Sequence, residues 1–112
     1  MRKLLWESIK NSSEFKKITR TGTKVSTPFF IFFKIKSDKF KLGVVASKKV
    51  GCAVERNRAK RVLRAAFSEV YTLSNSTTVL IAKSEILNAK YNEIKACLEK
   101  TIERPKIKYN FD

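Results

Sequence analysis

The chain has 112 residues, with 25 lysines and arginines against 10 acids and a formal net charge of +15. This length suits one domain, residues 1–112, with one modest core, and the cationic excess indicates a nucleic acid or an anionic membrane surface as partner. The longest apolar run, residues 28–33, is far too short to span a bilayer, and residues 1–15 lack the apolar region of a signal peptide, so we expect a cytoplasmic protein without a membrane partner.

Residues 1–10 are expected to form a loosely held arm. A short helix is predicted to begin at Asn11 or Ser12, which are good N-cap residues, and to stop at Gly22. Residues 23–27 follow as a brief extended segment.

Residues 28–36, PFFIFFKIK, alternate in the manner of a strand and carry aromatic side chains on both faces. A turn at residues 37–39 leads into a second strand, residues 40–48. A hairpin is the simplest account of these two strands.

Residues 47–64 form a basic box, the segment on which the functional interpretation depends. It contains a single acid, Glu55, and seven cations: Lys48, Lys49, Arg56, Arg58, Lys60, Arg61 and Arg64. From Val54 onward two helical faces separate at 100° per residue. The apolar face carries Ala59, Val62, Leu63, Ala66, Phe67 and Val70, and the cationic face carries Asn57, Lys60, Arg61 and Arg64.

A charged helix face is usually ordinary solvated surface, but this one holds cations with almost no acids among them. Like charges at i, i+4 spacing, such as Arg56 and Lys60, repel one another and cost helix stability. A polyanion would relieve that repulsion, and arginine is suited to bidentate hydrogen bonds with phosphate. The pattern therefore favours nucleic-acid binding.

The C-terminal third is predicted to contain a buried strand, residues 77–83, and an amphipathic helix that begins at Ile86 or Asn88 and stops before Pro105. Residues 105–112 are expected to be a loosely ordered basic tail. The resulting order, α-β-β-β-α-β-α, predicts an α+β sandwich with helices packed on a mostly antiparallel sheet.

The sequence has two cysteines, Cys52 and Cys97, and no histidine. Two distant cysteines make a poor zinc site, a disulfide is not expected in a reducing compartment, and the usual Ser-His or Cys-His nucleophile pairs cannot be built. We therefore expect neither metal ligands nor catalytic residues in the protein.

The box resembles that of the protein subunit of bacterial ribonuclease P. The residues that carry the resemblance are Lys48-Lys49-Val50-Gly51, Ala53-Val54, Arg56-Asn57-Arg58, Lys60-Arg61 and Arg64. The resemblance implies a four-stranded, ribosomal-protein-like sheet with a left-handed β-α-β crossover. It also implies a ribonucleoprotein endonuclease whose large RNA is the catalyst, with Mg²⁺ held mainly by that RNA and the substrate.

In this family the protein binds ribonuclease P RNA through the box and the 5′ leader of precursor tRNA through a cleft, and no protein partner is implied. By resemblance, Phe15 and Phe33 fall at aromatic cleft positions, and Thr19 falls where some relatives carry an aromatic residue. Core packing and leader stacking are both open interpretations of Phe33.

Two other functions remain open on composition alone. A ribosomal or ribosome-assembly RNA-binding protein would have the same charge, and only the spacing within the box argues against it. A self-sufficient nuclease needs paired carboxylates, and Glu55, Glu69 and Glu85 form no such motif.

Overall fold

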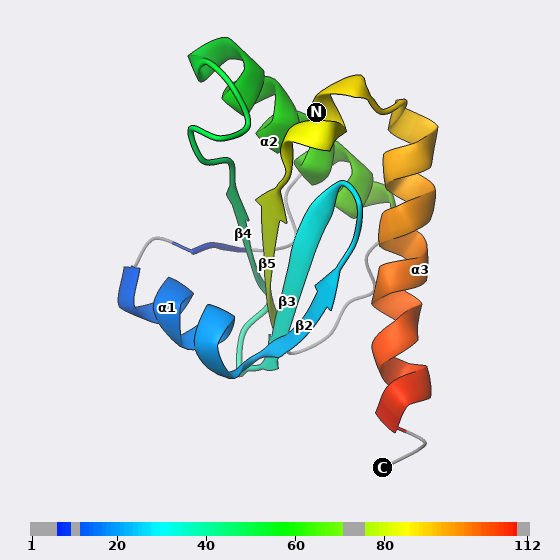
Figure 1. The fold of residues 1–112 in the computed structure, drawn as a ribbon. Coiled ribbons are helices and arrows are strands. Elements are labelled where there is room, and N and C mark those ends of the chain that lie inside the picture. Colours follow the sequence, from blue (N-terminus) through cyan, green and yellow to red (C-terminus); the bar gives the residue numbers. More distant parts are fainter. Residues whose placement is uncertain (1–6, 10–11, 71–75, 110–112) are drawn as a thin grey trace.

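The computed structural model describes residues 7–9, 12–70 and 76–109, and the account below concerns these residues. Strands and helices follow one another along the chain as shown in Figure 1. In order they are β1 (Glu7–Ser8), α1 (Ser12–Thr21), β2 (Thr23–Ser26), β3 (Phe30–Lys36), β4 (Lys41–Val45), α2 (Ala53–Val70), β5 (Ser76–Ala82), a 3-10 helix (Ser84–Asn88) and α3 (Tyr91–Tyr109). The α+β class and the order of elements predicted from the sequence are confirmed, with two additions, the two-residue β1 and the 3-10 helix.

The strands form one sheet in the order β1-β4-β5-β3-β2. Among the four longer strands, β2–β3 and β3–β5 are antiparallel while β4–β5 is parallel. The sheet is therefore mostly antiparallel, as predicted, and β4, α2 and β5 form the expected β-α-β unit. The short β1 adds a parallel pairing with β4, so residues 7 and 8 of the predicted arm belong to the sheet.

The predicted hairpin between residues 28–36 and 40–48 is wrong, because β5 lies between β3 and β4. All but one residue of β5 are buried, and a strand that is buried in this way needs a neighbour on each edge and cover on both faces. The hairpin rule considers only strands adjacent in sequence, so it missed this insertion. The hairpin that does form joins β2 to β3, where Thr27 Oγ1 donates to Phe30 O at 2.7 Å.

Helices cover both faces of the sheet, which explains why β3 carries aromatic residues on both sides. Phe30 and Phe32 belong to the larger core, which α2 and α3 cover. Phe33 belongs to a smaller cluster with Val79 of β5 and Ile18 of α1. In Figure 1, α1 lies at the lower left of the sheet and α3 at its right.

Gly22 ends α1 as predicted, but a left-handed conformation is not the reason, since Gly51 is the glycine with positive φ. A Cβ on Gly22 would lie 2.7 Å from Ile18 O and 2.9 Å from Lys34 O. Glycine therefore allows the end of α1 to approach the backbone of β3 closely.

The prediction that the last helix stops before Pro105 is wrong, because α3 continues to Tyr109. Proline removes one helical hydrogen bond and disfavours helix in the residue before it, but it does not forbid a helix already formed over several turns from continuing. The backbone of residues 105–109 is thus helical, and residues 110–112 lie outside the described part of the chain. Within that part, every helix is too short or too polar to cross a bilayer.

Candidate nucleic-acid interface

The start of α2 is fixed by a cap that involves the only acid of the basic box. Cys52 N donates to Glu55 Oε1 at 2.9 Å, and Arg56 N donates to Cys52 O at 2.9 Å. Glu55 thus plays the glutamate part of a capping box, with cysteine standing where serine or threonine is usual. The Cys52 backbone N–H, followed by the Cys52 side chain, lowers the pKa of Glu55 below its ordinary value of 4.5. The carboxylate is therefore ionised at neutral pH and is committed to the helix terminus.

Gly51 provides the turn into this cap. Its φ is +153°, and a Cβ at this position would collide with the Glu55 carboxylate. The Gly51 carbonyl also accepts a hydrogen bond from Arg56 Nη1 at 3.1 Å. The backbone angle thus favours glycine, and a Cβ here would displace the Glu55 carboxylate from the cap. The Arg56 guanidinium is partly held in place before any ligand arrives.

The apolar face of α2 packs on the larger core, as the periodicity predicted. Its buried members are Ala59, Leu63, Ala66 and Phe67, and Val62 and Val70 are partly buried against them. Leu63 is 0% exposed. This packing fixes the rotation of α2 about its axis, so the opposite face must point away from the sheet.

The cationic face of α2 is exposed to solvent. Asn57, Arg58, Arg61 and Arg64 are exposed, while Arg56 and Lys60 lie at the flank and are partly buried. The two ion pairs found within the described residues are Lys41–Glu14 at 3.1 Å and Lys95–Glu69 at 3.7 Å, and neither involves this face. The repulsion between its cations is therefore not relieved within the described part of the protein.

Lys48 and Lys49 extend this surface into the turn before α2. Both are exposed, whereas the next residue, Val50, is 4% exposed and belongs to the larger core. Val50 N donates to Ser47 O at 3.0 Å, which closes the turn. The buried valine thus anchors a turn that carries two lysines next to the start of α2, and the predicted box residues occupy one continuous stretch of structure.

The predicted leader-binding residues lie on the other face of the sheet. Phe15 of α1 is partly buried against the cluster that contains Phe33, and Phe33 itself is 6% exposed. Thr19 Oγ1 donates to Lys16 O at 3.1 Å within α1. The structure therefore gives Phe33 a place in the core, while its role in leader stacking stays a prediction.

Sequence reasoning did not single out Lys83, which lies just after β5. Its Nζ donates to Ser26 Oγ of β2 at 3.0 Å. Ser26 pairs with Ile31, one of the partly buried residues packed against the Phe33 cluster, so this cation stands on the α1 side of the sheet. The strand order brings Lys83 and Ser26 together, and neither residue has a sequence motif that could have revealed the contact.

Among the described residues, no group of three or more cysteine, aspartate or glutamate side chains is placed to hold a metal ion. The acids that do have contacts act within the fold. Glu93 accepts from the backbone N–H of Lys90 at 2.9 Å, Glu69 pairs with Lys95, and Glu55 caps α2. Each of these three carboxylates is thus engaged in a contact within the fold.

Comparison with known proteins identifies related chains. The family model for ribonuclease P matches residues 6–106. The ribonuclease P protein component of Nitratiruptor sp. is 39% identical over 101 residues, covering 89% of this chain and 93% of that protein. The ribonuclease P protein component of Listeria monocytogenes is 34% identical over 95 residues, covering 80% of each chain.

Solved structures of RNase P proteins have the same fold as this chain. The Staphylococcus aureus RNase P protein superposes with a TM-score of 0.76 at 29% identity, covering 88% of this chain and 94% of that one. A mutant of that protein with defective mRNA degradation activity gives a TM-score of 0.79 at 28% identity, with 88% and 87% coverage. The Thermotoga maritima RNase P protein shares the fold, with a TM-score of 0.75 at 22% identity and coverage of 88% and 96%.

Proposed function

The chain belongs to the ribonuclease P protein family, and from this premise we propose that it binds ribonuclease P RNA and helps that RNA remove the 5′ leader of precursor tRNA. The observation that carries the proposal is the cationic face of α2. That face is exposed, and its orientation is fixed by the buried apolar face of α2 and by the Glu55 cap at the start of the helix. The ribosomal alternative gains no support from the two relatives reported above, each of which is named as a ribonuclease P protein component.

The RNA contacts of the proposal are phosphate contacts. Arg61 and Arg64 are exposed on the outward face of α2, and Arg56 is pre-oriented by its bond to the Gly51 carbonyl. One guanidinium group can bind a phosphate through two parallel hydrogen bonds, and a side chain that is already fixed loses less conformational entropy on binding. Lys48 and Lys49 would add contacts from the preceding turn.

Catalysis is proposed to belong to the RNA, because the protein offers neither histidine nor, in its described part, a cluster of metal-binding side chains. Mg²⁺ binds readily through phosphate oxygens and keeps several of its waters. We therefore assign the ions to the RNA and the substrate, and assign to the protein the tasks of binding and positioning.

Reconstitution tests the proposal. Pure protein with precursor tRNA and Mg²⁺ should leave the substrate intact, and adding ribonuclease P RNA should produce cleavage at the mature 5′ end. At low Mg²⁺, the RNA with protein should cleave faster than the RNA alone. Site-specific cleavage by RNA-free protein would contradict the assignment of catalysis, and a protein that leaves the RNA-catalysed rate unchanged would contradict the function itself.

Leader binding on the α1 side of the sheet gives a separate prediction. If Phe15 and Phe33 stack on leader nucleotides, Phe15→Leu and Phe33→Leu should each weaken binding of precursor tRNA relative to mature tRNA. Stacking on an aromatic side chain is worth roughly 1–3 kcal/mol per base, so a loss of about tenfold is expected. The measurement is the ratio of the two dissociation constants for the reconstituted complex.

Phe40→Leu is a matched control for Phe15→Leu, because Phe40 is also partly buried but packs beside Phe67 on the opposite side of the sheet. It should leave the ratio of the two dissociation constants unchanged. An equal effect of Phe15→Leu or Phe33→Leu on precursor and mature tRNA would show that the residue acts only in the core.

A further inference from the structure

The outer face of α1 carries a second group of cations, separate from the box. Lys16, Lys17 and Arg20 are all exposed. At 100° per residue they fall within one 100° arc of the helix, and the residues opposite this arc are Ile18, which is 1% exposed, and Phe15, which is partly buried. The three cations therefore point away from the sheet.

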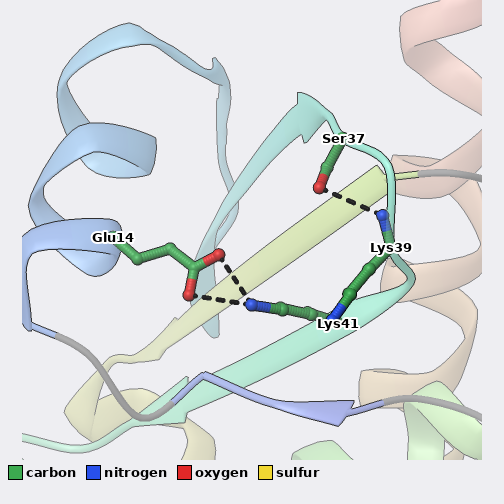
Figure 2. Close-up of polar contacts among 4 residues, drawn as sticks. All are labelled: Glu14, Ser37, Lys39 and Lys41. Atoms are coloured by element: carbon green, nitrogen blue, oxygen red, sulfur yellow. Dashed lines mark hydrogen bonds and ion pairs between the residues drawn. The ribbon is translucent and has the colours of Figure 1, made fainter.

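The single acid of α1 does not neutralise these cations. Glu14 accepts hydrogen bonds from Lys41 Nζ at 3.1 and 3.2 Å, so its carboxylate is directed across to β4, as Figure 2 shows. Neither ion pair found among the described residues involves Lys16, Lys17 or Arg20. Lys16 and Arg20 also stand at i, i+4, where like charges destabilise a helix.

The helix dipole accounts for only part of this pattern. Arg20 lies in the last turn of α1, where a cation is favourable. Lys16 and Lys17 lie in the middle of the helix, beyond the reach of that effect. An external anion is the simpler source of compensation for all three.

The two cationic helix faces point to opposite sides of the protein. The buried residues of α2 pack with Phe30 and Phe32, whereas Ile18 of α1 packs with Phe33. Alternate residues of β3 face opposite ways, so the sheet separates α1 from α2. RNA backbone that lies along the cationic face of α2 therefore does not also lie along the outer face of α1, on the other side of the sheet.

We propose that Lys16, Lys17 and Arg20 form a second phosphate-binding surface, which holds a segment of ribonuclease P RNA other than the one bound by α2. The inference rests on the proposed function and deepens it: the protein would lie between two RNA segments and fix their separation. The phosphate backbone is the expected ligand, because the surface consists of three cationic side chains only. No aromatic residue lies among them on which a base could stack.

The test compares two triple variants with the same change in charge. K16Q/K17Q/R20Q removes the proposed surface, and K39Q/K90Q/K100Q removes three exposed lysines from three separate segments of the chain. Affinity for ribonuclease P RNA is measured at several salt concentrations. Because each lost phosphate contact lowers the slope of log affinity against log salt by about 0.7–0.9, the α1 triple should flatten it by about 2–2.7, and the control triple should change it far less.

A further variant, R61A/R64A, shows whether a negative result contradicts only this inference or also the proposed function. If R61A/R64A flattens the slope and the two triples behave alike, the α1 face is ordinary surface and the inference is overturned. If R61A/R64A also binds like the wild type, the proposed function fails first. A loss by the α1 triple that appears only with anionic phospholipid vesicles, and not with RNA, would likewise overturn the inference.

A tethered probe tests whether the two segments differ. Cys52 is exposed beside the box, so Fe(II)-EDTA attached there in a C97A background should cleave RNA near α2. The same reagent on K17C, in a C52S/C97A background, should cleave a different segment. Cleavage of the same nucleotides from both positions, or no cleavage from position 17, would contradict a second surface.

Discussion

Replacing Leu63 with alanine is expected to lower the free energy of unfolding by about 2–5 kcal/mol, while the salt dependence of RNA binding by the folded protein stays unchanged. Leu63 is 0% exposed and lies in the larger core between α2 and the sheet. Its loss removes apolar contacts and leaves a cavity, but no cation is moved or removed. Denaturant titration gives the stability, and RNA titration at several salt concentrations gives the slope.

Val54→Ala is the matched control for Leu63→Ala. Val54 lies on the same helix but is 76% exposed, so its truncation should change stability by no more than about 0.5 kcal/mol. A Leu63→Ala protein as stable as the wild type would contradict the placement of this face of α2 against the core.

The double variant Arg61→Ala/Arg64→Ala is expected to do the reverse. Both side chains are exposed and face away from the core, so the melting temperature should stay nearly unchanged, or rise slightly because repulsion on the face is reduced. Two lost phosphate contacts should flatten the plot of log affinity against log salt by about 1.4–1.8. Thermal melts and titrations of ribonuclease P RNA measure the two effects on the same samples.

Lys90→Ala/Lys100→Ala removes the same charge from exposed positions near and on α3 and serves as the control. It should leave the slope close to that of the wild type. If the arginine variant bound ribonuclease P RNA with wild-type affinity and slope, the cationic face of α2 would be ordinary surface, and the proposed function would lose its main support.

The helix that carries the interface was predictable because apolar and cationic residues recur in the sequence at helical spacing on two different faces. Leu63 and Phe67 recur one turn apart on one side, and Arg61 and Arg64 recur on the other. Amphipathic periodicity over five turns is a strong local signal. The structure places these four residues as the pattern predicted.

The cap on that helix was not predicted, although both of its residues, Cys52 and Glu55, belong to the basic box. A capping box is usually sought as serine or threonine followed three residues later by glutamate, and here the first position is Cys52. The contact uses the backbone N–H of Cys52, which every residue but proline has. The sequence lacks the serine or threonine that usually marks a capping box, so the pattern distinguishes Glu55 only as the one acid among the cations.

Pairing of strands was the least predictable part of the fold. The alternation in residues 28–36 predicted a strand, and β3 occupies residues 30–36, but alternation does not say which strand lies beside it. Besides the short β1, β4 pairs with β5, which lies on the far side of α2 in the sequence. The aromatic residues gave a similar ambiguity, since Phe33 is buried by α1, a helix whose docking side the sequence did not specify.

The central position of β5 has a consequence for how the protein acquires its structure during synthesis. The chain emerges N-terminus first, so β3, β4 and α2 leave the ribosome before β5, the strand that joins β3 to β4. Contacts between segments far apart in sequence form slowly, because the loop between them must be closed before any pairing energy is gained. Until β5 inserts, Leu63 has only part of its core to pack against. We therefore expect the nascent chain to present its basic helix in a fixed orientation only after residue 82 has emerged.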